Sequence, residues 1–157
     1  HQGDWETFYL LTMGLPVSTV LKRELLYIPF FGWALAMLNP IAIDRKRKTN
    51  ALKQLSQQGC ERLNAGISVV IFPEGTRRPP GSLGPCPKGA AMLAHQAGVP
   101  ILPIVQNSGR LSPPHKWIKH AGKVNVRIGQ PISADVSTKQ MHAQMVDWMT
   151  ENLAQIS

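Results

Sequence analysis

The amino-acid sequence predicts an α/β fold: a single domain in which helices flank a mostly parallel β-sheet. Short apolar runs rich in β-branched residues alternate along the chain with longer segments of helical periodicity, which is typical of parallel sheets. The 157 residues, 43% of them hydrophobic and 17% charged, are sufficient for one packed core. Because no repeat or domain-sized linker interrupts them, residues 1–157 are interpreted as one domain.

The first part of the chain is predicted to supply two helices and two strands. Residues 4–13 form a short helix, for which Asp4 is a suitable N-cap. An apolar strand follows at 17–21. The helix at 29–38 carries a proline in its first turn, where proline is tolerated, and a short strand at 41–43 comes after it.

The middle of the chain combines a surface helix, a buried strand and a loop. Leucine and cysteine residues at 49–64 recur on one helical face, and Gly66 stops that helix. The run at 68–72 is continuously apolar, as expected of a buried parallel strand. Residues 78–87 are too rich in proline and glycine for helix or sheet. Because ligands bind beyond the carboxyl ends of parallel strands, this loop is expected to line a site.

The last part of the chain predicts two helices and two strands. Small residues at 88–97 indicate a helix that Gly98 ends, and an apolar strand follows at 99–105. Strict alternation at 123–128 is typical of a half-buried strand. A closing helix is expected at 138–154.

The charge of the chain predicts an anionic partner. Seventeen Lys and Arg stand against nine Asp and Glu, giving a formal net charge of +8, and no acidic residue occurs from Gly75 to Ala134. A phosphate-bearing molecule, an acidic membrane surface and a nucleic acid all fit this balance. The two cysteines, Cys60 and Cys86, lack the spacing of paired metal ligands, so neither a disulfide framework nor a metal site is expected.

An uncharged stretch at 25–43 allows three interpretations. Its 19 residues approach the length of a membrane span, but prolines, a glycine and an asparagine interrupt it and basic residues flank it on both sides. It could instead pack in the core, or lie at a lipid interface. In the last case the aromatic residues Tyr27, Phe30, Phe31 and Trp33 would face the headgroups.

Two acids and a histidine open the chain. Residues five apart on one helix are separated by about 140° of rotation, since each residue turns about 100°. His1 can therefore pair with Glu6 only if it lies in the turn before the helix. A carboxylate there would fix the imidazole tautomer and stabilise its protonated form. The alternative is an acid favoured by the helix dipole beside an uninvolved histidine.

Two further places carry reactive groups at the ends of apolar runs. In Phe72-Pro73-Glu74-Gly75-Thr76-Arg77, Gly75 allows close backbone approach and Arg77 offers a planar fork for phosphate oxygens. Residues 39–45 deliver Asp44 and Arg45 after a strand. Taken singly, a solvated arginine and a surface ion pair are the simpler readings.

Together and in this order, these motifs resemble the lysophospholipid acyltransferase family, in particular its bacterial members that acylate 1-acylglycerol 3-phosphate. The H-x-x-x-x-D/E block matches 1–6, the apolar block ending in Asp-Arg matches 32–45, F-P-E-G-T-R matches 72–77, and V-P-I-x-P-V matches 99–105. Four ordered blocks are a specific signal. One departure is Glu6, where many members have Asp; Asp4 is a conceivable substitute.

The resemblance implies a glycerol-3-phosphate acyltransferase-like fold, a catalytic domain whose N-terminal portion is missing, and an O-acyltransferase activity. It implies transfer of a fatty acyl group from acyl-CoA or acyl-ACP, with no cofactor, to the free hydroxyl of 1-acylglycerol 3-phosphate, which gives phosphatidic acid. His1 and Glu6 would be catalytic. The substrate-binding residues would be Glu74, Gly75, Thr76, Arg77, Lys22, Arg45 and Lys88.

The implied partners are a lysophospholipid, an acyl thioester and an anionic membrane surface, without nucleic acid, at the cytoplasmic face of the inner membrane. Two alternatives stay open. One is the same chemistry on another lysophospholipid or on glycerol 3-phosphate. The other is a non-catalytic module that binds anionic lipid; it explains the charge but not the acids beside His1 and Arg77.

Overall fold

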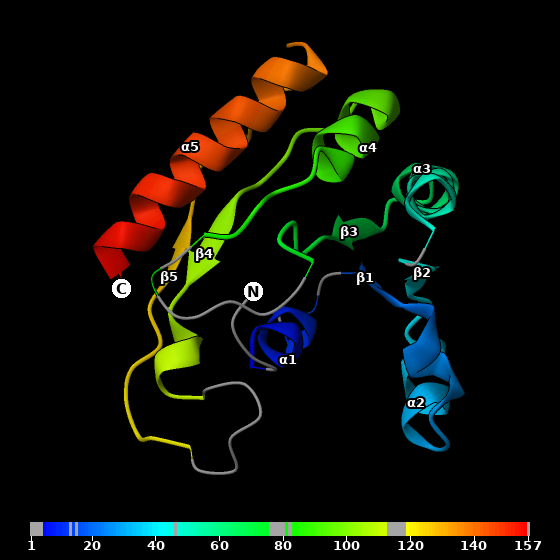
Figure 1. Cartoon of the computed structure of the whole chain (residues 1–157), viewed down its shortest axis with the longest axis horizontal. Coiled ribbons are helices and arrows are strands. Elements are labelled where there is room, and N and C mark those ends of the chain that lie inside the picture. The colour runs from blue at the N-terminus through cyan, green and yellow to red at the C-terminus, as the bar shows by residue number, and fades with distance from the viewer. Residues whose placement is uncertain are drawn as a thin grey trace. The chain divides into compact units, whose positions relative to one another are not determined.

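The computed structural model describes residues 5–12, 14, 16–45, 47–75, 81, 83–112 and 119–156. The chain divides into two compact units, each considered by itself below (Figure 1). The smaller unit is Gly14–Ile71. The larger unit comprises His1–Met13 together with Phe72–Ser157.

The smaller unit is built on a three-stranded parallel sheet. Its strands are β1 (Val17–Lys22), β2 (Ile41–Ile43) and β3 (Ser68–Val70), in the order β2-β1-β3. Val20 pairs with Ile41 and Val17 with Ser68, so all three strands point the same way. The predicted parallel sheet is thus confirmed, although β3 ends two residues before the strand expected at 68–72.

Between β1 and β2 the chain forms a 3-10 helix, η1 (Arg23–Tyr27), and a short helix, α2 (Phe31–Met37). The sequence predicts a helix at 29–38 but not η1. Gly32 makes the pair possible, because a Cβ atom there would lie 2.3 Å from the carbonyl oxygen of Leu26. Only glycine therefore lets α2 lie this close to the backbone of η1.

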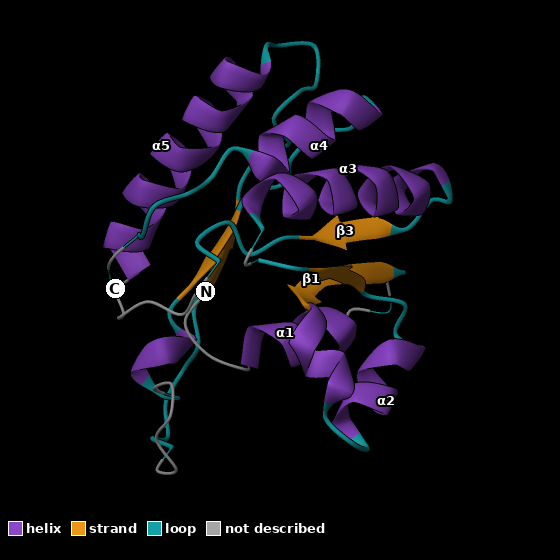
Figure 2. Cartoon of the chain, turned by 45° about the vertical axis from the view of Figure 1, so that its right-hand side comes forward, coloured by secondary structure: helices purple, strands orange, loops and turns teal. Residues whose placement is uncertain are grey.

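Helix α3 (Lys48–Asn64) packs against both edge strands, β2 and β3, and lies alongside the sheet in Figure 2. Leu55 is its most deeply buried leucine. The carbonyl of Asn39 accepts hydrogen bonds from Ser18 Oγ (2.7 Å) and Arg62 Nε (3.3 Å). These bonds tie the start of β2 to β1 and to α3.

The larger unit contains an antiparallel strand pair, which the sequence did not predict as such. Strands β4 (Ile104–Gln106) and β5 (Val126–Ile128) pair Ile104 with Ile128, and an isolated bridge joins Ile101 to Ile132. Both strands are shorter than the predicted 99–105 and 123–128. Pro100 and Pro103 interrupt the first run because proline has no N–H to donate to a ladder.

Two helices cover this strand pair. Helix α4 (Gly89–Ala97) ends at Gly98, whose φ of 65° and ψ of 30° match the predicted glycine stop. Helix α5 (Thr138–Ile156) lies beside α4 and along β4 (Figure 1). Its buried stripe recurs every three or four residues, as a core-facing helix requires: Met141, Met145, Met149, Leu153 and Ile156.

The uncharged stretch at 25–43 is divided among η1, α2 and β2. Among the residues that the structure describes, no helix is both long enough and apolar enough to cross a membrane. Most of the large side chains between Tyr27 and Leu38 are exposed rather than packed in the core. Burial of the whole stretch is therefore excluded, and only Ile41 of β2 is fully enclosed.

Candidate active site

The predicted catalytic carboxylate is buried in the larger unit. Glu6 lies in the first turn of helix α1 (Trp5–Thr12) and is only 5% exposed. Its Oε2 accepts a hydrogen bond from Ser108 Oγ at 3.3 Å. A carboxylate loses much hydration on burial, so partners of this kind are needed to keep it in place. Glu6 is thus a buried and oriented acid, unlike one that merely favours the start of a helix.

Ser108, which donates to this carboxylate, is not among the site residues predicted from the sequence. It follows β4 and opens a 3-10 turn, η2 (Ser108–Arg110), and it is 1% exposed. The available signal was the polar triplet Gln106-Asn107-Ser108 directly after an apolar run. Loops that follow strands often carry functional residues, so polar residues directly after a strand are candidates for a site.

In the turn after β3, the structure explains the presence of two of the predicted residues, Gly75 and Glu74. The N–H of Gly75 donates to the carbonyl of Phe72 at 3.0 Å, and Gly75 has a φ of 67°, which favours glycine. Glu74 is buried, and its Oε2 accepts a hydrogen bond from the backbone N–H of Gly84 at 3.1 Å. Glu74 therefore fastens the proline-rich loop to this turn.

That loop also holds a cysteine whose thiol is kept neutral. Burial, and then the nearby charge of Glu74, raise the pKa of Cys86. The backbone carbonyl of Cys86 lies 2.7 Å from His142 Nε2, which links the loop to α5. A raised pKa lowers the fraction of thiolate at neutral pH, and with it the nucleophilicity of the sulfur.

Lys22 and Arg45 belong to the smaller unit, where both lie at one edge of its sheet. Lys22 ends β1 and pairs in register with Ile43, the last residue of β2, two positions before Arg45. Both basic residues thus stand at the carboxyl edge of the parallel strands. Partial burial lowers the pKa of Arg45 and the charge of Glu24 opposes this effect. A guanidinium titrates so far above neutrality that it stays charged.

The remaining predicted residues are placed only in part. Lys88 is exposed and precedes the first residue of α4 in the larger unit. His1, Thr76 and Arg77 lie outside the described residues. The pairing of His1 with Glu6 and the binding of phosphate by Arg77 stay predictions. In the described part of the chain, no three His, Cys, Asp or Glu side chains are grouped to hold a metal ion.

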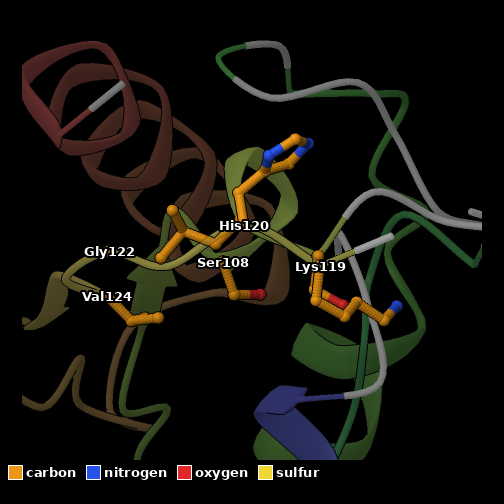
Figure 3. Close-up of a pocket in the computed structure, with 7 residues that line it drawn as sticks. Ser108, Lys119, His120, Gly122 and Val124 are labelled. Carbon is orange, nitrogen blue, oxygen red and sulfur yellow. The ribbon is translucent and has the colours of Figure 1, made fainter. Parts of the chain in front are cut away.

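An open depression of about 400 Å³ adjoins Ser108 in the larger unit (Figure 3). Its floor is mostly apolar, and Lys119 and His120 add basic groups at the surface. In Figure 3 the ring of His120 points away from Ser108. The lining residues are Ser108, Leu111, Ser112, Lys119, His120, Gly122 and Val124.

Sequence comparison identifies the class to which this fold and site belong. A family model described as Acyltransferase matches residues 2–107, and the chain belongs to that family. The match contains Glu6, Lys22, Arg45, Lys88 and the turn at 74–77. It stops one residue before Ser108.

The individual relatives are more specific. The chain is 48% identical to the 1-acyl-sn-glycerol-3-phosphate acyltransferase of Pseudomonas aeruginosa, an alignment that covers 100% of this chain and 63% of the relative. It is 34% identical to the protein of the same name from Saccharomyces cerevisiae, over 96% of this chain and 54% of the relative. The chain thus spans between half and two thirds of the length of these proteins.

A solved structure agrees with both comparisons. The crystal structure of the 1-acyl-sn-glycerophosphate acyltransferase from Thermotoga maritima matches with a TM-score of 0.79 and 26% identity, over 99% of this chain and 63% of that chain. The predicted acyltransferase α/β fold is confirmed by this similarity.

Proposed function

We propose that this chain is the catalytic part of an O-acyltransferase that converts 1-acylglycerol 3-phosphate into phosphatidic acid. The observation that carries the proposal is the buried, hydrogen-bonded carboxylate of Glu6 five residues after His1, in a chain of the acyltransferase family. The names of the bacterial and yeast relatives support this acceptor. The donor is an acyl thioester, acyl-CoA or acyl-ACP, and no cofactor takes part.

In the proposed mechanism, His1 acts as a general base on the free hydroxyl of the acceptor while Glu6 orients the imidazole. The hydroxyl oxygen attacks the thioester carbonyl, a C–O bond forms and the C–S bond breaks. The proton held by the imidazole then passes to the departing thiolate. Atoms and charges balance without an acyl-enzyme, which agrees with the raised pKa of the Cys86 thiol.

Binding of the acceptor phosphate is assigned to Arg77, helped by Lys22, Arg45 or Lys88. Arginine suits this role because its planar fork can donate two parallel hydrogen bonds to phosphate oxygens. Within the smaller unit, Lys22 pairs in register with Ile43, two positions before Arg45, so both basic residues lie at the same edge of that sheet. Glu74 acts indirectly, since it anchors the loop that follows the phosphate-binding turn.

We also propose that the protein works on an anionic membrane surface, at the cytoplasmic face of the inner membrane. The support is the exposed apolar surface of η1 and α2, where Phe30 is 79%, Trp33 63% and Met37 84% exposed. The rings of Phe30 and Trp33 stack edge to face, with centroids 5.2 Å apart. Aromatic rings in a segment that follows the exposed Arg23 in the sequence suit the headgroup region of a bilayer.

The deciding experiment measures release of free thiol from acyl-CoA by the full-length protein, with a panel of lyso-acceptors. Turnover should be highest with 1-acylglycerol 3-phosphate, and His1→Ala should abolish it without loss of folded structure. Lysophosphatidylcholine and glycerol 3-phosphate serve as competing acceptors. If either competitor is preferred, it becomes the assigned acceptor in place of 1-acylglycerol 3-phosphate. Absence of thiol release with every acceptor would refute the proposed activity.

A second substitution tests the phosphate site. Arg77→Ala should raise the KM of the acceptor far more than that of the thioester, because only the acceptor is held by that guanidinium. The matched control is Arg78→Ala, the neighbouring arginine, which should leave both values unchanged. Equal changes for the two substrates would contradict the assigned role of Arg77.

A further inference from the structure

We propose that Ser108 is a positioning residue that fixes the direction of the Glu6 carboxylate, and through it the orientation of the catalytic base. The inference rests on the proposed function, because it assigns Ser108 to the same reaction. Ser108 does not act on the substrate itself. Its role is to supply one of the hydrogen bonds that hold the Glu6 carboxylate.

The contact has the properties of a support rather than of a surface hydrogen bond. Ser108 Oγ donates to Glu6 Oε2 at 3.3 Å, and the two side chains are 1% and 5% exposed. Although an open depression adjoins Ser108, both side chains are shielded from solvent, so water competes little for this hydrogen bond. A buried carboxylate deprived of a donor turns toward whatever polar group remains.

Ser108 is itself held rigidly. Its backbone N–H donates to Gln106 Oε1, and its carbonyl accepts from Leu111 N (3.0 Å) and Ser112 N (2.8 Å). In Figure 3 its hydroxyl points away from Val124 and to the side on which Lys119 lies. The hydroxyl therefore leaves a fixed backbone in a fixed direction.

The preceding residue anchors this segment to two other elements. Asn107 is buried; its side-chain amide donates to the carbonyl of Ile156 at 2.9 Å, and its Oδ1 accepts from the N–H of Asn125 at 2.8 Å. Helix α5 and the residue that directly precedes β5 thus both brace the turn that carries Ser108. A site group must be held within a fraction of an ångström, and supports of this kind provide that precision.

The test compares Ser108→Ala, Ser108→Thr and Ser108→Cys in the full-length protein, each also with Glu6→Gln. Ser108→Ala should lower kcat about 10- to 100-fold without changing either KM, because the base is misdirected but substrate contacts are kept. Ser108→Thr keeps a hydroxyl and should retain most of kcat. In the Glu6→Gln background, Ser108→Ala should cause no additional loss.

Thermal unfolding of every variant separates this role from a purely structural one. Equal losses of kcat in the presence and absence of the Glu6 carboxylate would overturn the inference, as would wild-type kcat in a folded Ser108→Ala protein. Should the alanine variant not fold, the nearly isosteric Ser108→Cys carries the test. A weak S–H donor there should lower kcat although the fold is kept, and full activity would reject the role.

A readout that needs no acyl transfer distinguishes failure of this inference from failure of the proposed function. Modification of His1 by diethyl pyrocarbonate, followed by mass spectrometry, reports the state of the imidazole directly. Its rate should change by the same factor in Ser108→Ala and Glu6→Gln. A change in Glu6→Gln alone would reject Ser108 as the support, even in a protein that transfers acyl groups.

Discussion

Two regions of the molecule stand in opposite relation to water. In the larger unit the Glu6 carboxylate is withdrawn from solvent and held by Ser108. In the smaller unit, the segment from Tyr27 to Leu38 leaves seven large apolar side chains exposed. Twelve such side chains are exposed in the described part of the chain, so this short segment holds more than half of them.

Folding alone favours neither arrangement. Burial of a charged group costs free energy, and an exposed apolar cluster forgoes the gain from its own burial. Each is therefore better explained by what it does to a ligand. In the proposed function, the first region orients an acid for chemistry, whereas the second presents a surface to lipid.

The largest effect should come from the buried acid. Glu6→Gln removes the charge that stabilises the protonated imidazole, so kcat for thiol release should fall about 10²- to 10⁴-fold. Asp4→Asn is the matched control, because Asp4 is the other acid within reach of His1 in the sequence. If the two variants exchange these outcomes, the orienting carboxylate is Asp4.

An intermediate effect is expected at the exposed segment. Replacement of both Phe30 and Trp33 by serine should weaken binding to anionic phospholipid vesicles at least about tenfold, since two rings no longer enter the interface. Co-sedimentation measures this binding, and kcat with a detergent-dispersed acceptor should stay unchanged. Leu52→Ser on α3 is the control, as Leu52 is also exposed in the smaller unit.

Other outcomes would identify a different occupant of that surface. If the double variant binds vesicles as strongly as the wild type, the surface around Phe30 and Trp33 is not the membrane contact. A change of oligomeric state in analytical ultracentrifugation would indicate a second copy of the chain instead.

The smallest effect concerns the backbone that presents those rings. Gly32→Ala should lower the free energy of unfolding by about 1–3 kcal/mol, because the new Cβ meets the backbone oxygens of Leu25 and Leu26. The better helix propensity of alanine offsets only about 1 kcal/mol of this cost. Urea denaturation measures the difference.

A second glycine provides the matched comparison. At Gly122 a Cβ would approach Leu111 Cδ2, at 2.4 Å, and that side chain can rotate away. Gly122→Ala should therefore be milder. A loss at Gly32 as small as the loss at Gly122 would show that α2 and η1 can separate at little cost.

The sequence predicted those features that depend on local pattern. The order of helices and strands follows from periodicity, and Gly98 ends α4 as its conformational freedom predicts. The range at 99–105 was too long because Pro100 and Pro103 have no N–H to donate to a neighbouring strand. The range at 123–128 was too long because alternation does not say which residues of a strand find a partner. The direction of β5 relative to β4 also depends on chain reversal in space, which no local pattern encodes.

The same distinction applies to the candidate site. Glu6, Glu74 and Gly75 could be found because they occur in motifs with a recognisable chemical purpose. Ser108 could not, since its importance lies in a contact with a residue 102 positions away. Serine after a strand is common, and only coordinates distinguish one that supports a carboxylate.

The hydrogen bond from Asn107 to the carbonyl of Ile156 determines when, during synthesis and folding, the turn that carries Ser108 can be completed. It joins residues 49 positions apart, and the bond from Ser108 to Glu6 spans 102, so both close large loops of chain. Contacts between distant residues form late in folding, because loop closure must precede them. Until the residues up to Ile156 have been synthesised, the segment that carries Ser108 lacks its hydrogen bond to α5, so the proposed support of Glu6 is incomplete.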